Sequence, residues 1–189
     1  DANAKGGQLY LSAGTSAAQT GGRVLIRSGV STAKTSGAVG VVTAASGTNG
    51  VSGYLVLSTG MSANGNSGAM FVGSGTSSSG RGGSVYVTVG SGNSGSGGEL
   101  VLSGGNSDSH SGGRVVIKTG YGSSTTSGSL YLATADSAAG GVSGFIVMST
   151  GMSTKGNSGS MYLGSGSSAS GRGGSVYVTV GSGNSGSGG

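Results

Sequence analysis

Gly83-Ser84-Val85-Tyr86-Val87-Thr88-Val89-Gly90 is the stretch that decides the predicted fold, because the same eight residues return at 174–181, 91 positions later. The glycine that begins it belongs to a series spaced 15, 15, 16, 15, 15 and 15 residues apart, after which the six spacings repeat in the same order. We call these residues the anchor glycines. They are Gly7, Gly22, Gly37, Gly53, Gly68, Gly83, Gly98, Gly113, Gly128, Gly144, Gly159, Gly174 and Gly189.

Apolar residues occupy fixed places after each anchor glycine. The second and fourth positions are apolar in all twelve repeats. Side chains two apart on a strand share a face, so the pattern predicts one short strand per repeat with two inward residues. Candidate core residues are Leu55, Leu57, Val85, Val87, Val176 and Val178. Glycines such as Gly83, Gly98, Gly113 and Gly174 are expected to turn the chain, with positive φ angles at the corners.

A fixed period of this length is typical of a solenoid. We predict an all-β fold, a parallel β-solenoid of about twelve coils of 15–16 residues with a flat, two-sided cross-section. Its predicted parts are a lead-in at 1–6, six-coil units at 7–97 and 98–188, and the start of a further coil at 189. A solenoid also needs capping coils that cover its open ends. We therefore expect this chain to be part of a longer chain or to stack end to end with other copies.

The third position after each anchor glycine should face outward, yet it is apolar or aromatic in eleven of twelve repeats. Strand propensity alone is one explanation. The other is an interaction stripe that packs laterally against a second copy. The candidate stripe residues are Tyr10, Phe71, Tyr86, Val101, Val116, Tyr131, Tyr162 and Tyr177.

The composition argues against several kinds of site. There are 47 Gly, no Pro, no Cys and no Trp, and only 7% of residues are charged. The nine Lys and Arg are scattered, whereas nucleic-acid binding usually shows a basic stripe. Asp108, Ser109 and His110 fall on one turn, so they do not form a catalytic triad. The GxGxxG match at 90–95 lacks a following helical pattern. We expect no enzyme activity, metal, cofactor or membrane insertion.

In its anchor glycines and paired apolar columns, the whole chain resembles the glycine- and serine-rich parallel β-solenoid repeat proteins as a class. The resemblance implies a structural repeat of an extracellular or cell-surface filament or appendage, a self-assembling fibre. Self-association, lateral and end-to-end, is the expected partnership, and the many Ser and Thr are candidates for O-linked glycans. The architecture is also similar to β-solenoid ice-binding proteins, so ice binding or surface adhesion is the alternative, although no rank of Thr-x-Thr recurs.

Overall fold

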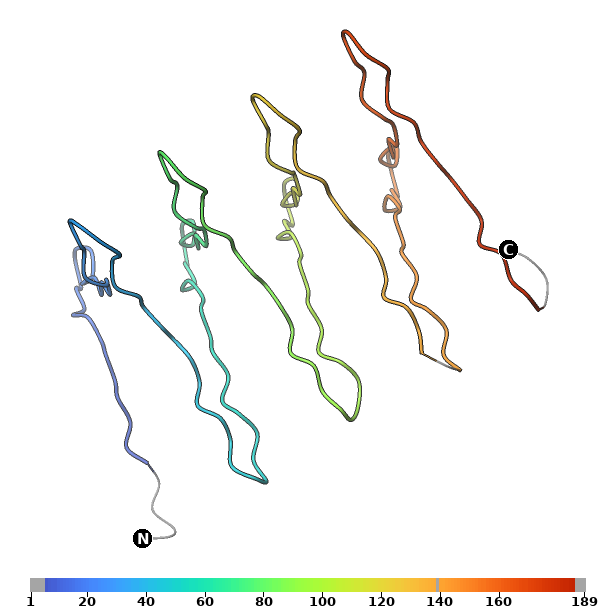
Figure 1. Ribbon diagram of the computed structural model, residues 1–189. Coiled ribbons are helices and arrows are strands. Elements are labelled where there is room, and N and C mark those ends of the chain that lie inside the picture. The colour runs from blue at the N-terminus through green and yellow to red at the C-terminus, as the bar shows by residue number, and fades with distance from the viewer. Residues whose placement is uncertain (1–5, 139, 186–189) are drawn as a thin grey trace. The chain divides into compact units, whose positions relative to one another are not determined.

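The computed structural model describes residues 6–138 and 140–185, and this part of the chain contains neither α-helix nor β-strand (Figure 1). Extended segments alternate with short bends, and no sheet is formed by the described residues. The prediction of an all-β parallel β-solenoid is therefore wrong. Of the predicted lead-in only Gly6 is described, and the predicted coil start at Gly189 also lies outside the described residues.

The hydrogen bonds explain why the predicted strands are missing. A β-solenoid would pair each apolar segment with the next one, 15 or 16 residues along the chain. Instead, most of the backbone hydrogen bonds outside regular elements join residues only eight apart. Among the described residues, no apolar residue at the second, third or fourth position after an anchor takes part in one. An extended segment without a paired neighbour is not a strand of a sheet.

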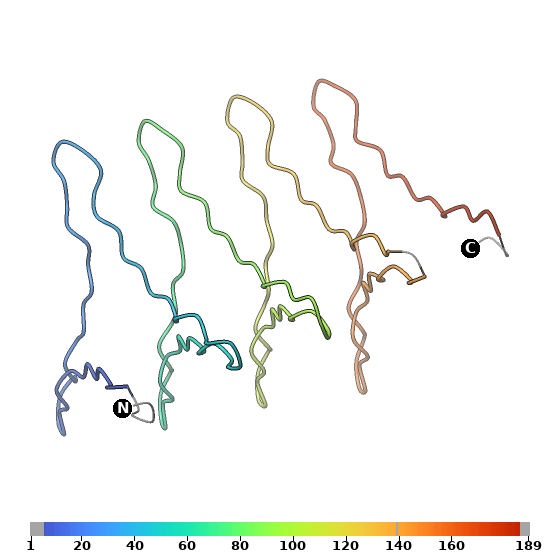
Figure 2. The same cartoon turned by 60° about the horizontal axis from the view of Figure 1, so that its bottom comes forward.

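Bends recur with the period of the sequence. Nine three-residue bends begin ten residues after an anchor glycine (Figure 2). They span residues 17–19, 32–34, 63–65, 78–80, 93–95, 108–110, 123–125, 154–156 and 169–171. The repeat therefore has a structural counterpart, which is a recurring loop rather than a strand.

Each of six loops is closed at its neck by one backbone hydrogen bond, which we call the clasp. The N–H of an anchor glycine donates to the carbonyl oxygen eight residues earlier, as Gly22 does to Gly14 at 2.8 Å. The other clasps join Gly37 to Gly29, Gly83 to Gly75, Gly113 to Gly105, Gly128 to Gly120 and Gly174 to Gly166, at 2.8–3.4 Å. The clasp brings the two sides of the loop together just before the apolar segment begins.

Close approach at the clasp is what requires glycine. A Cβ at Gly22 would lie 2.9 Å from the Gly14 nitrogen, and one at Gly83 would lie 3.0 Å from the Cβ of Ser74. Positive φ is not the reason, because only Gly95 and Gly140 adopt it among the described residues, and neither is an anchor. The expectation of positive φ is therefore wrong for the described anchors, which run from Gly7 to Gly174.

The four anchors that we expected to turn the chain, Gly83, Gly98, Gly113 and Gly174, are not among the glycines with positive φ. Three of them donate a clasp hydrogen bond, and their role in turning the chain stays a prediction. At Gly98 an added Cβ would lie 2.6 Å from Cγ1 of Val89, so there too the neighbouring segment leaves room only for glycine.

The two repeats of 16 residues place their turn differently. Gly50 N–H donates to the Gly47 carbonyl at 3.2 Å, and Gly141 N–H donates to the Ala138 carbonyl at 3.1 Å. Each is a three-residue separation, as in a β-turn. The extra residue of these repeats is therefore accommodated at the loop tip.

The chain divides into two units, Asp1–Gly98 and Glu99–Gly189. The three clasps of the first unit, at Gly22, Gly37 and Gly83, have counterparts in the second at Gly113, Gly128 and Gly174. Local structure is thus repeated with the 91-residue period of the sequence. The finer division into units at 7–97 and 98–188 stays a prediction.

No hydrophobic residue of the described chain is buried. The six residues expected in the core remain more than half exposed, from 52% at Val176 to 83% at Val178, with Leu55, Leu57, Val85 and Val87 between them. Without a second layer of side chains opposite them, these residues form no core within the chain.

Candidate interaction surface

The apolar segments of the chain form one recurring surface element. We define a triplet as the residues at the second, third and fourth positions after an anchor glycine. The twelve triplets are 9–11, 24–26, 39–41, 55–57, 70–72, 85–87, 100–102, 115–117, 130–132, 146–148, 161–163 and 176–178. None contains a charged residue. All their large side chains are exposed, which is unusual for so many apolar residues at regular spacing.

Exposure varies with position inside a triplet. In the octapeptide, Tyr86 is 85% exposed, whereas Val85 before it is 53% exposed. The pair Tyr177 and Val176 shows the same contrast, at 87% and 52%. Where the middle residue is aromatic, it is therefore the most exposed residue of its triplet, whereas Val101 is less exposed than Leu102 and Val116 is equal to Ile117.

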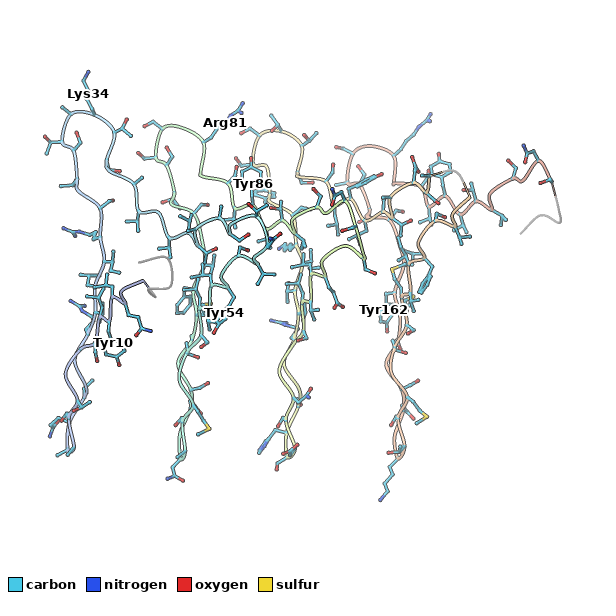
Figure 3. The ribbon with its side chains drawn as sticks, turned by 90° about the horizontal axis from the view of Figure 1, so that it is seen from below. Tyr10, Lys34, Tyr54, Arg81, Tyr86 and Tyr162 are labelled. Carbon is cyan, nitrogen blue, oxygen red and sulfur yellow. The ribbon has the colours of Figure 1, made fainter. Side chains whose placement is uncertain are left out.

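The predicted interaction stripe consists of such middle residues. All eight are exposed, and the structure places each on a separate triplet. They are Tyr10, Phe71, Tyr86, Val101, Val116, Tyr131, Tyr162 and Tyr177. Figure 3 shows Tyr10, Tyr86 and Tyr162 standing off the ribbon. Exposure alone does not separate the stripe from its neighbours in the triplets, so its role stays a prediction.

Each copy of the octapeptide begins at a loop neck that two hydrogen bonds close. Besides the clasp to Gly75, the carbonyl of Gly83 accepts a hydrogen bond from Ser74 Oγ at 2.6 Å. Ser165 Oγ donates to Gly174 in the same way, also at 2.6 Å. Sequence reasoning missed these serines. The signal was present, because the same residue type stands nine before the anchor in both copies.

Serine hydroxyls also stabilise the bends. Nine of the twelve repeats carry Ser at the ninth position after the anchor. Its hydroxyl accepts a hydrogen bond from the backbone N–H three residues later in the bends that follow Ser16, Ser31, Ser62, Ser107 and Ser153, at 2.8–3.1 Å. Such local bonds to Ser favour turns over regular secondary structure. The glycine-rich loops therefore have a defined local geometry.

The cations among the described residues lie beside the triplets and at the loops. Arg23 and Arg27 flank triplet 24–26, and Arg114 and Lys118 flank triplet 115–117 in the same way. Arg81 lies on a loop and points away from the ribbon, as does Lys34 (Figure 3). The formal net charge is +5. Two copies that approach each other along the triplets therefore meet like charges at their edges.

The sequence motifs that resemble catalytic, phosphate-binding or metal sites do not form such sites in the described residues. Asp108 and His110 share the bend 108–110, where the His110 N–H donates to Ser107 Oγ at 3.0 Å. The GxGxxG match at 90–95 precedes no helix in the described residues. No group of three or more His, Asp or Glu capable of holding a metal occurs in the part of the chain that the structure describes.

Residues 6–138 and 140–185 include no helix of the length and hydropathy that a bilayer crossing requires. Comparison of the chain with protein-family models, with curated proteins and with solved structures finds no match.

Proposed function

We propose that this chain is a structural segment of an extracellular or cell-surface filament or appendage, and that it works by self-association of copies through the triplets. One observation carries the proposal: a third of the residues are hydrophobic, they recur at a fixed period, and no described hydrophobic residue is buried. Apolar area of this extent is the surface that association buries.

The accessible area supports association on a large scale. The chain exposes 19102 Å² for a mass of 17.5 kDa. A compact monomer of that mass exposes about 7900 Å². The excess is roughly 11000 Å², several times the ~1600 Å² buried in a typical protein–protein interface. Contact with several neighbouring copies, rather than one small partner, matches this excess.

The repeat supports another copy of the same chain as the partner. The octapeptide at 83–90 and its repeat at 174–181 have the same sequence, so a surface that fits one of them fits the other. Each chain therefore carries at least two equivalent sites. Two sites on one chain link copies without closure, which yields fibres rather than a closed oligomer.

The proposed location rests on the resemblance of the glycine- and serine-rich repeat to surface and fibrous proteins. The exposed Ser and Thr residues remain candidates for O-linked glycans. Antibody labelling of the source material tests the location: signal at the outer surface supports it, and signal confined to the cell interior contradicts it.

Sedimentation velocity and negative-stain electron microscopy over a range of concentrations test the self-association. We expect growth into elongated assemblies as concentration rises. A monodisperse monomer at all concentrations contradicts the proposal. Monomers that show thermal hysteresis in ice would favour the ice-binding alternative instead.

A further inference from the structure

Tyrosine is the most prominent oxidisable side chain on the surface of this protein. The sequence has no Cys and no Trp, but seven Tyr and five Met. All seven tyrosines are 85–93% exposed. Within the described residues none of their hydroxyls takes part in a side-chain hydrogen bond. Disulfides cannot join copies of this chain, so an oxidative link has to use another residue type.

The tyrosines are also placed where copies would meet. Five of the seven stand in the middle of a triplet, namely Tyr10, Tyr86, Tyr131, Tyr162 and Tyr177. Tyr86 and Tyr177 stand at the same place in the two copies of the octapeptide. Each copy begins at a loop neck that the hydroxyl of Ser74 or Ser165 closes with an additional hydrogen bond. Association that brings identical octapeptides together brings these two rings together as well.

We propose that the middle tyrosines of the triplets, Tyr86 and Tyr177 foremost, are sites of oxidative coupling that joins copies by dityrosine. This inference rests on the proposed function, because the rings of two copies come into contact only in the assembly. It assigns the tyrosines a covalent role in addition to packing.

The coupling balances with an external one-electron oxidant. Each of two phenols loses one electron and one proton to give a tyrosyl radical. The two radicals form a carbon–carbon bond between ring positions next to the hydroxyls, and each ring regains aromaticity when its hydrogen moves to the oxygen. A peroxidase supplies the oxidising equivalents, since one hydrogen peroxide takes up the two electrons and two protons and yields two water molecules.

Methionine oxidation does not compete as a route to a link. A Met thioether takes up oxygen and becomes a sulfoxide, which forms no bond to a second chain.

Coupling of tyrosyl radicals also requires two rings to be in contact during the lifetime of the radicals. The pattern of links therefore reports which tyrosines face each other between copies.

The test uses the full chain above and below the concentration at which it assembles. A photo-excited ruthenium tris-bipyridyl complex with persulfate generates the radicals, so no bulky enzyme has to reach the interface. Trypsin then separates the sites, because Tyr86 is the only tyrosine in peptide 82–114 and Tyr177 is the only one in peptide 173–189. We expect dityrosine-linked dimers of these two peptides from the assembled protein and their loss from the dilute protein.

Two variants complete the test. Tyr86→Phe with Tyr177→Phe keeps the rings but removes the phenols, so assembly should persist while links between these peptides are lost. Tyr121→Phe, outside the triplets, should leave those links intact. Normal assembly with no link at 82–114 or 173–189, or with links spread equally to peptide 35–81, whose only tyrosine is Tyr54 outside the triplets, overturns the inference alone. Absence of assembly in sedimentation contradicts the proposed function instead.

Discussion

Replacing both octapeptide tyrosines, Tyr86→Ser with Tyr177→Ser, should weaken self-association by a predictable amount. A fully buried Tyr removes roughly 200 Å² from water. At 85% and 87% exposure, nearly all of that area remains available to a partner. If half of each ring is buried in the assembly, about 85 Å² at ~25 cal/mol per Å² contributes about 2 kcal/mol per ring. That is about 30-fold in the dissociation constant for one ring and about 1000-fold for two.

Sedimentation velocity over a dilution series measures this change as a shift in the concentration at which assemblies form. The matched control is Met61→Ser with Met152→Ser. These methionines are 95% and 89% exposed and 91 residues apart, but they lie outside the triplets. The control should assemble within a fewfold of the parent chain. Equal weakening by the two double variants would refute the reasoning, because any exposed apolar group would then serve as well as a triplet residue.

Three further predictions follow from the loops and the charges. Raising the salt concentration from 0.1 to 1 M, which shortens the screening length from about 10 to about 3 Å, should promote assembly of this +5 chain in light-scattering measurements; inhibition by salt would contradict contact along the triplets. Gly22→Ala should open its clasp to Gly14 and speed amide hydrogen exchange at residue 22 about fivefold, for a bond worth about 1 kcal/mol. Gly29→Ala, where an added Cβ meets no atom within 4 Å, should not open the clasp between Gly29 and Gly37 or speed exchange at residue 37. Ser74→Ala with Ser165→Ala should speed exchange at the two anchors that follow, and unchanged rates there would show that the hydroxyl bonds add nothing to the neck.

The period of the local structure was predictable from sequence, whereas the fold was not. The structure has a bend ten residues after nine of the anchors, because bends depend on nearby residues such as Ser31 and its bond to the Lys34 N–H. A strand, in contrast, requires a partner at a distance. Alternation in Val85-Tyr86-Val87 is compatible with a sheet but does not supply the hydrogen bonds that define one. Most backbone hydrogen bonds of the described chain instead join residues eight apart and close the loops. The sequence period did not predict this loop closure.

The interaction surface was predictable only in part. Counting positions from the anchor identifies Tyr86 and Tyr177 as residues of one type in one place, and the structure leaves both exposed. It leaves Val85 and Val176 more than half exposed too, where the sequence predicts a core. Binary patterning tells which residues avoid water, but whether they do so within the chain or between chains depends on whether the chain supplies a second layer.

The clasps give the chain reserve length. Each clasp holds eight residues in a loop whose neck is a single backbone hydrogen bond, apart from the two necks reinforced by Ser74 and Ser165. Such a bond contributes only about 1 kcal/mol, and the eight residues it holds span roughly 26–29 Å when extended. A chain under tension would therefore lengthen loop by loop, at the low force that breaks a single backbone hydrogen bond.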